Sequence, residues 1–315
     1  MAKNNTVVMA SDMGYVWGVW LLVASMRMSG MDEPVLVGCS GWNDNWTKVI
    51  TSFPDVSLLP MPPEDKRNMT CSKPILMMAP KTEFSTWVDC DGIFSGNCSD
   101  VLMDNSPERE QVIYLRRRTP GELQDLYKKE RQPGDPPGEI PPCVLDVWRK
   151  DVGDLEVPRR KYGCSTGVIS VHERWKPFIR RWREQIEKVL PSDVGVVTKG
   201  SIGYFQTDDS VLNSLLVFAK DAPQVTTTYR ANDASRPHFI HYGWNPKPWV
   251  MWNPRSIGWF DKTVSVVEWA FEQGYKPEAP LPYTLKRKNY AICKLLSPLA
   301  ANVQRLRKLR KKLGF

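Results

Sequence analysis

The sequence predicts an α/β fold, in which helices flank a central sheet. An apolar, β-branched run at residues 6–10 predicts a strand, the apolar stretch 15–26 predicts a buried helix, and residues 34–38 predict a second strand. A strand, a helix and another strand over so short a length indicate a parallel crossover unit. Two further strand-like runs, at residues 84–88 and 163–171, extend the predicted sheet.

Amphipathic helices supply a second reason for this fold class. Residues 177–190 place their apolar side chains on one helical face, and Pro177 suits a first helical turn. A second amphipathic helix is predicted after Thr207, with an apolar stripe that ends at Phe218. Residues 73–78 predict a further short helix. Helices of this kind cover the faces of a sheet with their apolar sides.

Two segments are predicted to lie outside the sheet and its helices. Residues 55–70 contain three prolines and are expected to form a loop. Residues 104–150 include a Pro- and Gly-rich run at 132–142, which cannot propagate a helix or a central strand. We interpret 104–150 as a surface insertion, which either orders over a ligand or is disordered.

The basic character of the chain belongs to its C-terminal end. Residues 286–315 contain ten lysines and arginines and no acidic residue, so the formal net charge of +8 leaves −2 for residues 1–285. A near-neutral body disfavours a protein with a basic groove for nucleic acid. Apolar residues recur at three- and four-residue steps over 299–313, which predicts a basic amphipathic helix. Such a helix either lies on an anionic membrane, packs on the body or is a solvated tail.

The cysteine content favours a reducing compartment. The seven cysteines are odd in number, scattered, and never spaced as CxxC, which argues against a disulfide scaffold or a zinc ribbon. The sequence shows neither a secretory signal pattern at its start nor an apolar run near the roughly 18 residues that span a bilayer. We therefore expect a cytoplasmic protein, with a peripheral membrane contact through the basic tail as one of the alternatives given above.

The strongest local signal is the pair Asp89 and Asp91 at the end of a predicted strand. Side chains two residues apart on a strand point to the same side, so two carboxylates would share one face. This arrangement suits a hard divalent cation such as Mg²⁺ or Mn²⁺. The alternative is a turn acid followed by a turn glycine, Gly92.

Two other pairs of polar residues precede predicted helices. Ser11 and Asp12 end the first strand, where ligands gather in open α/β sheets, but they also suit an Asx turn or a helix cap. Asp208 and Asp209 precede a helix and would satisfy its free N–H groups as caps. One of these two aspartates as a cap and the other as a site residue is compatible with both interpretations.

Two basic or metal-binding side chains lie in an aromatic, turn-rich segment. His241, at a predicted strand end, is either a metal ligand or a hydrogen-bonded core histidine. Lys247 stands between two prolines in a stiff loop, which would aim its ammonium group at a phosphate; its alternative is a solvated surface lysine.

The order of these motifs resembles a GT-A glycosyltransferase. The sequence is most similar to glycosyltransferase family 8, the group of glycogenin and the bacterial lipopolysaccharide galactosyltransferases. The resemblance spans about residues 6–250. Its motifs, in sequence order, are Ser11-Asp12-x-x-Tyr15, Lys73, Trp87-Val-Asp89-Cys-Asp91, Ser165-Thr-Gly167, Asp208-Asp209-x-x-Leu212-Asn213 and His241-Tyr-Gly-Trp-Asn-Pro-Lys247-Pro-Trp249.

The resemblance implies a fold and a division into two parts. The fold is a Rossmann-like mixed sheet of GT-A type, flanked by helices and followed by a basic amphipathic helix. Residues 1–285 would form the catalytic domain, including the insertion at about 104–150, and residues 286–315 the basic tail.

The resemblance also implies ligand-binding roles. Asp89 and Asp91 would bind Mn²⁺ or Mg²⁺ together with His241, and Lys247 would contact the diphosphate. A nucleotide-sugar, UDP-linked in most of the family, would be the donor. Its binding residues would be Ser11, Asp12, Tyr15, Lys73, Thr166, Gly167 and Lys247.

The implied activity is transfer of a hexose from this donor to a glycan or glycolipid acceptor, with Asp208 and Asp209 as the catalytic candidates near the anomeric carbon. Asp209 stands where family 8 usually has glutamine, so the retaining outcome typical of that family does not carry over. The departing diphosphate develops negative charge, which a dication and a lysine would stabilise.

Two other functions compete with this one. The run Val88–Ile93 resembles the start of a haloacid-dehalogenase-like phosphatase, with Asp89 as nucleophile and Asp91 as acid/base. That motif normally opens its domain, whereas a strand–helix–strand unit precedes it here. A non-catalytic membrane- or nucleic-acid-binding protein would rest on the basic tail alone.

Overall fold

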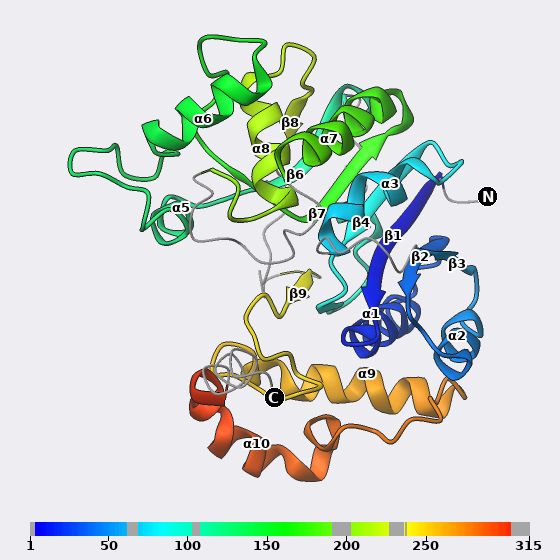
Figure 1. Ribbon diagram of the computed structural model, residues 1–315. Helices are drawn as coiled ribbons and strands as arrows, with labels where there is room; N and C mark the ends of the chain where they lie inside the picture. The colour runs from blue at the N-terminus through cyan, green and yellow to red at the C-terminus, as the bar shows by residue number, and fades with distance from the viewer. Residues whose placement is uncertain are drawn as a thin grey trace.

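The computed structural model describes residues 4–61, 69–102, 108–190, 203–226, 236 and 238–303. A mixed sheet forms the centre of the molecule (Figure 1), with the strand order β3-β2-β1-β4-β7-β6-β8. The first four strands of that order are parallel to one another, β7 is antiparallel to β4 and β6, and β8 is parallel to β6. The strands are β1 (Asn5–Asp12), β2 (Val35–Ser40), β3 (Val56–Pro60), β4 (Phe84–Val88), β6 (Val112–Arg117), β7 (Cys164–His172) and β8 (Gln224–Thr226).

Helices cover both faces of the sheet, and two separate apolar cores result. Alternate residues of β1 divide between them: Val7 and Met9 belong to one core, Val8 and Ala10 to the other. On the first face lie α1 (Val16–Met28), α2 (Asp44–Thr51) and α9 (Phe260–Glu272). On the second lie α3 (Lys73–Met78), α5 (Pro120–Leu126), α6 (Pro142–Val152), α7 (Lys176–Val189) and α8 (Asp208–Phe218).

The apolar character of α1 follows from its position. The helix lies between the sheet and α9, so nearly all of its residues from Val16 to Met26 are buried, whichever side they point to. This confirms the buried helix predicted for residues 15–26. Within the described residues, no helix is both long and apolar enough to cross a bilayer.

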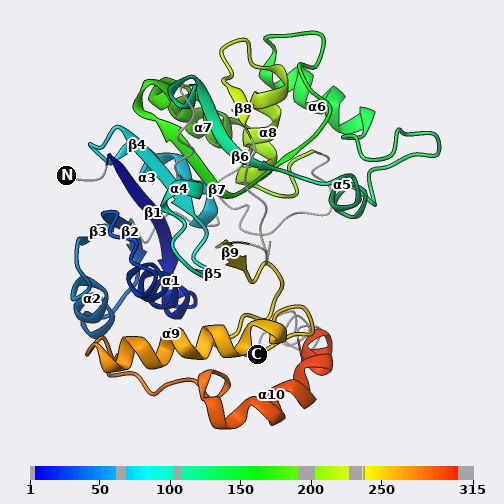
Figure 2. The same cartoon turned by 180° about the vertical axis from the view of Figure 1, so that it is seen from behind.

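A second, two-stranded sheet lies beside the carboxyl end of the first. It pairs β5 (Gly92–Phe94) antiparallel with β9 (Phe239–His241), so Gly92 lies opposite His241. Figures 1 and 2 show β9 between the large sheet and the layer formed by α9 and α10 (Tyr290–Leu296). The remaining α-helix of the described residues is α4 (Ser99–Leu102), which follows β5.

Two of the expected loops are corrected by the structure. Residues 56–60 form β3 rather than a loop; β3 is an edge strand and Pro60 is its last residue, a position where the missing N–H costs no ladder hydrogen bond. The stretch 104–150 is not a surface insertion throughout, because β6 pairs on both sides within the sheet and both α5 and α6 contribute to the core. The Pro- and Gly-rich run has no helix or strand up to residue 141, as expected.

The predicted tail helix lies largely outside the described residues, which end at Val303. Leu299 ends a short 3-10 turn, and residues 301–303 are helical. The outcome for residues 304–315, and the boundary at 285/286, stay predictions.

A close helix–loop contact at Gly18 sets the position of the segment after β4. A Cβ atom on Gly18 would lie 2.2 Å from the Cys90 carbonyl oxygen and 2.7 Å from the Trp249 ring. We therefore expect Gly18→Ala to lower the free energy of unfolding by about 1–3 kcal/mol through overpacking. Urea denaturation measures the change.

Gly258→Ala is the matched control, because a Cβ there meets no atom within 4 Å. Its effect should stay within about 0.5 kcal/mol. Equal effects of the two substitutions would contradict the close contact at Gly18.

Candidate functional site

Three predicted metal ligands converge at the carboxyl edge of the sheet. Asp89, Asp91 and His241 each offer one ligand atom, and these atoms all lie within 4.8 Å of one another. Asp89 follows β4 directly, and its N–H still donates to the Gly167 carbonyl of β7 (2.8 Å). The β5–β9 pair brings in His241 from far along the chain, helped by the Tyr242 N–H, which donates to the Asp91 carbonyl (2.8 Å). The predicted convergence is confirmed.

Asp91 is the most heavily partnered of the three. Its Oδ1 lies 3.0 Å from His241 Nε2, and its Oδ2 accepts a hydrogen bond from Lys247 Nζ at 2.5 Å. Burial alone would raise the pKa of Asp91, but His241 and Lys247 hold it well below its ordinary value. Asp91 in turn raises the pKa of His241 against the effect of burial. Lys247 is 5% exposed, so it is not the solvated lysine of the alternative interpretation.

One carboxylate oxygen of Asp89 is hydrogen-bonded, and the other is turned toward His241. Its Oδ1 accepts from Trp87 Nε1 (2.8 Å) and lies 3.0 Å from Lys73 Nζ, while its Oδ2 is 4.0 Å from His241 Nε2. A Cβ atom on Gly167 would lie 3.3 Å from Asp89 Oδ2 and 3.5 Å from His241 Cε1. Glycine therefore leaves room in front of the three ligands.

These residues fit a divalent cation. Two carboxylates and an imidazole on one side, with space kept open by Gly167, suit Mn²⁺ or Mg²⁺ and leave positions for further oxygen ligands. Asp89 Oδ2, Asp91 and His241 Nε2 are the groups that would hold the ion.

Lys73 links Asp89, one of the three candidate metal ligands, to the two aspartates at the start of α8. Its ammonium group is 2% exposed and lies 3.0 Å from both Asp89 Oδ1 and Asp208 Oδ2. It also donates to the carbonyl and the hydroxyl of Thr166, at 3.1 Å each. Burial lowers the pKa of Lys73, but the two carboxylates reverse this and raise it above its ordinary value. Lys73 is thus a buried cation between two acids.

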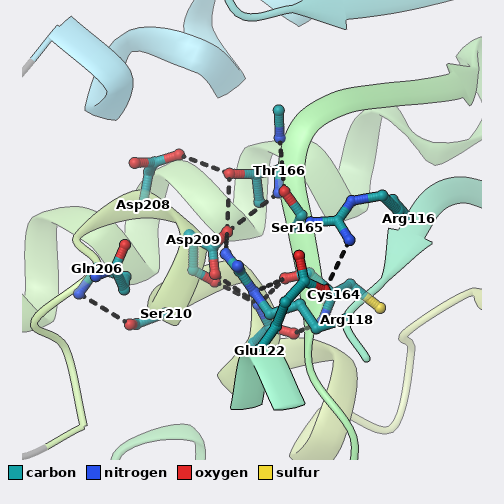
Figure 3. Close-up of polar contacts among 12 residues, drawn as sticks. Arg116, Arg118, Glu122, Cys164, Ser165, Thr166, Gln206, Asp208, Asp209 and Ser210 are labelled. Atoms are coloured by element: carbon teal, nitrogen blue, oxygen red, sulfur yellow. Dashed lines mark hydrogen bonds and ion pairs between the residues drawn. The ribbon is translucent and has the colours of Figure 1, made fainter. Parts of the chain in front are cut away.

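Arg118, which the sequence analysis missed, does the same for Asp209 (Figure 3). Its Nη2 lies 2.7 Å from Asp209 Oδ2, which also accepts from the Thr166 N–H at 3.1 Å. Asn213 Nδ2 donates to the other carboxylate oxygen at 3.1 Å. Burial lowers the pKa of Arg118, and Asp209 more than reverses the change. The one available signal was the run of three arginines at 116–118 after an apolar stretch, which is typical of a strand end.

Neither Asp208 nor Asp209 caps α8. Thr207 is the N-cap residue, and the cap has no side-chain hydrogen bond. Both carboxylates point instead toward β7, where the Thr166 hydroxyl lies 3.3 Å from each. The cap interpretation is therefore wrong for both. Burial raises the pKa of Asp208, with Asp209 and Asp89 adding to the rise and Lys73 opposing it.

The three residues expected to hold the nucleoside differ in their surroundings. Tyr15 packs edge-on against Trp249, with ring centroids 5.7 Å apart, and Lys247 Nζ lies 6.0 Å from its ring. Asp12 instead accepts a hydrogen bond from the Gly14 N–H (2.8 Å), which is the Asx turn of the alternative interpretation. Ser11 is buried, and its hydroxyl has no hydrogen-bond partner among the described residues.

No protein-family model matches the sequence, and no curated protein is similar to it. Solved structures are similar to it in three dimensions. The galactosyltransferase LgtC, crystallised with donor and acceptor sugar analogs, aligns over 87% of this chain and 98% of its own with a TM-score of 0.55 and 13% identity. The chain has the GT-A fold.

Two other glycosyltransferase structures agree. The bifunctional WbbM in its apo form has a TM-score of 0.55 and 13% identity, and the alignment covers 87% of this chain and 52% of WbbM. The apo form of GlyE from Streptococcus pneumoniae TIGR4 has a TM-score of 0.52 and 13% identity, over 87% of this chain and 65% of GlyE. At this identity the likeness establishes the fold, and the site must be argued from its own residues.

Removing Arg118 should leave Asp209 as a buried, uncompensated charge. We expect Arg118→Met to lower the free energy of unfolding by about 3–5 kcal/mol. Adding Asp209→Asn, which removes the charge but keeps the shape, should recover at least about 1 kcal/mol of this loss. Urea denaturation of the two single variants and the double variant measures the coupling.

Arg116→Met is the control. Arg116 pairs with Glu122, whose side chain is 39% exposed, against 12% for Asp209. A solvated pair of this kind should contribute less than about 1 kcal/mol. A similar small loss from Arg118→Met would mean that Asp209 does not depend on Arg118.

Proposed function

We propose that this protein is a metal-dependent glycosyltransferase. It would move a hexose from a nucleotide-sugar, UDP-linked as the resemblance implies, to a glycan or glycolipid acceptor. The observation that carries the proposal is the convergence of Asp89, Asp91 and His241, with Lys247 against Asp91, in a chain of GT-A fold. Ligands of open α/β sheets gather at this carboxyl edge.

The charges at this edge suit a leaving diphosphate. A bound dication supplies stabilisation for the negative charge that the departing nucleoside diphosphate develops. Lys247 is held nearby by the Tyr242 carbonyl at 2.9 Å, so it stays aimed at the same place when a ligand competes for Asp91. Tyr15, which lies beside Lys247 and packs against the buried Trp249, offers aromatic surface for the base of the nucleotide.

The acidic pair of α8 would act on the sugar side of the bond. Thr166 and Gly167 separate this pair from the metal-binding group and mark where donor sugar and acceptor would meet. Arg118 neutralises Asp209 and fixes its position, which suits a structural role. Asp208 shares its cation, Lys73, with Asp89 and is therefore less fully neutralised, so it is the better candidate to stabilise the oxocarbenium-like centre or to take a proton from the acceptor.

The phosphatase alternative is less well supported. Its nucleophile, Asp89, would need a free carboxylate oxygen facing a phosphate, yet Oδ1 is bound by Trp87 and Lys73 and Oδ2 faces His241. The three solved structures LgtC, WbbM and GlyE, to which this chain is similar in fold, are glycosyltransferases. The membrane contact expected of residues 299–315 stays part of this proposal.

Nucleotide binding with metal is the first test. UDP with Mn²⁺ should stabilise the protein by about 2.7 kcal/mol at a ligand concentration of 100 times Kd, and the shift in melting temperature measures it. Asp91→Asn should weaken the metal-dependent part at least about tenfold, since even outer-shell partners of a metal contribute about 10–100-fold.

Asp146→Asn, an exposed aspartate of α6, is the control and should retain the full shift. Failure of UDP, GDP and other nucleoside diphosphates to shift melting with Mn²⁺ present would contradict the proposal. Hydrolysis of generic phosphate esters that is lost in Asp89→Asn would favour the phosphatase.

Transfer itself is tested by Asp208→Asn. This variant should retain the UDP and Mn²⁺ shift but release nucleotide from its sugar donor at least about a hundredfold more slowly, the scale of a lost acid–base group. A panel of nucleotide-sugars with mass spectrometry of released nucleotide, run with and without Mn²⁺, provides the measurement. Release at the wild-type rate would exclude Asp208 from the reaction.

A further inference from the structure

The C-terminal layer of the molecule exposes large apolar side chains. Of the eleven such side chains that are exposed in the described residues, six lie between residues 283 and 299. This layer, formed by α10 and the turns around it, lies on the side of α9 that faces away from the sheet (Figures 1 and 2). The six are Tyr283, Tyr290, Ile292, Leu295, Leu296 and Leu299.

The helical segment around α10 has its large apolar residues on the outside. Ile292, Leu295, Leu296 and Leu299 follow the i, i+3, i+4, i+7 spacing of one helical face, and their exposed fractions are 47%, 76%, 42% and 49%. The buried positions carry small or polar side chains instead: Asn289, Cys293, Ser297 and Ala300. A helix that only covered the body would have the opposite pattern, so the outer face is built for contact with another apolar phase.

Charge around this face identifies the other phase. Lys288 and Lys294 are exposed cations of this segment, and no acidic side chain of the described residues pairs with either of them. Arg287 is different, since Asp261 and Glu268 of α9 neutralise it. Residues 279–315 contain no acidic residue at all.

We infer that the face formed by Ile292, Leu295, Leu296 and Leu299 inserts into the interface of an anionic lipid bilayer. Apolar side chains would enter the boundary between headgroups and acyl chains, while Lys288 and Lys294 reach the anionic headgroups. The inference concerns the described part of the basic tail, most of it before the amphipathic helix predicted over residues 299–313, and it does not depend on the proposed transfer activity.

Leu295→Asp in the full chain is the decisive variant, with Val157→Asp as its matched control. The two side chains are equally exposed, 76% and 75%, so neither substitution should disturb the core. Flotation with vesicles of phosphatidylcholine and phosphatidylglycerol should be about tenfold weaker for Leu295→Asp, because one leucine no longer enters the bilayer. Val157→Asp should bind as the wild type does.

Lys288→Gln and Lys294→Gln should each weaken binding about fivefold, and vesicles of phosphatidylcholine alone should bind least. Equal flotation of Leu295→Asp and Val157→Asp would overturn the inference, as would wild-type protein that fails to bind anionic vesicles. A wild-type dimer in light scattering that Leu295→Asp converts to a monomer, without a change in flotation, would identify a second copy as the occupant and also overturn it. The UDP and Mn²⁺ melting shift of each variant reports on the proposed function separately.

Discussion

The gathering of four carboxylates, two of them buried and two half-buried, is the constraint on which the site depends. Asp208 lies close enough to Asp89 and Asp209 for the three to repel, and the low dielectric of the interior strengthens that repulsion. Asp91 lies beside Asp89. Cations from other helices and strands pair with these carboxylates. Lys73 at the start of α3 serves two of the acids, Arg118 after β6 serves a third, and Lys247 with His241 serves the fourth.

This arrangement fixes the acids before any ligand arrives. Thr166 contributes its N–H, its carbonyl and its hydroxyl to the same network, which ties β7 to both α3 and α8. A network whose members are all hydrogen-bonded holds its side chains in single positions. Preorganised groups of this kind do not need to reorient when charge develops during a reaction. The position of each cation also gives the acids different surroundings. The acids near Gly167 face the open side of the site, whereas Asp209 faces Arg118.

The sequence predicted the parts of this site that depend on short-range pattern. Asp89 and Asp91 were identifiable because they directly follow a predicted core strand, although both lie in the bend between β4 and β5 rather than on a strand. The elements β1, β4, α7 and α8 follow from apolar periodicity. Arg118 was not identifiable, because its pairing with Asp209 depends on how β6 joins β7, and no local pattern encodes a strand's partner. The loop predicted around Pro60 was wrong for a related reason, because proline is tolerated in a strand only when that strand lies at an edge.

The two-stranded sheet of β5 and β9 has a consequence for how the protein is made. One strand directly follows the aspartate pair, and the other ends in His241, so the three candidate ligands come from the two ends of a segment that covers about half of the chain. During synthesis, the early strands and α1 emerge well before β9 does, and they can pack before the histidine exists. The scaffold of the site can therefore fold before its last candidate ligand is synthesised, and a product cut short before β9 would be folded in part yet lack His241.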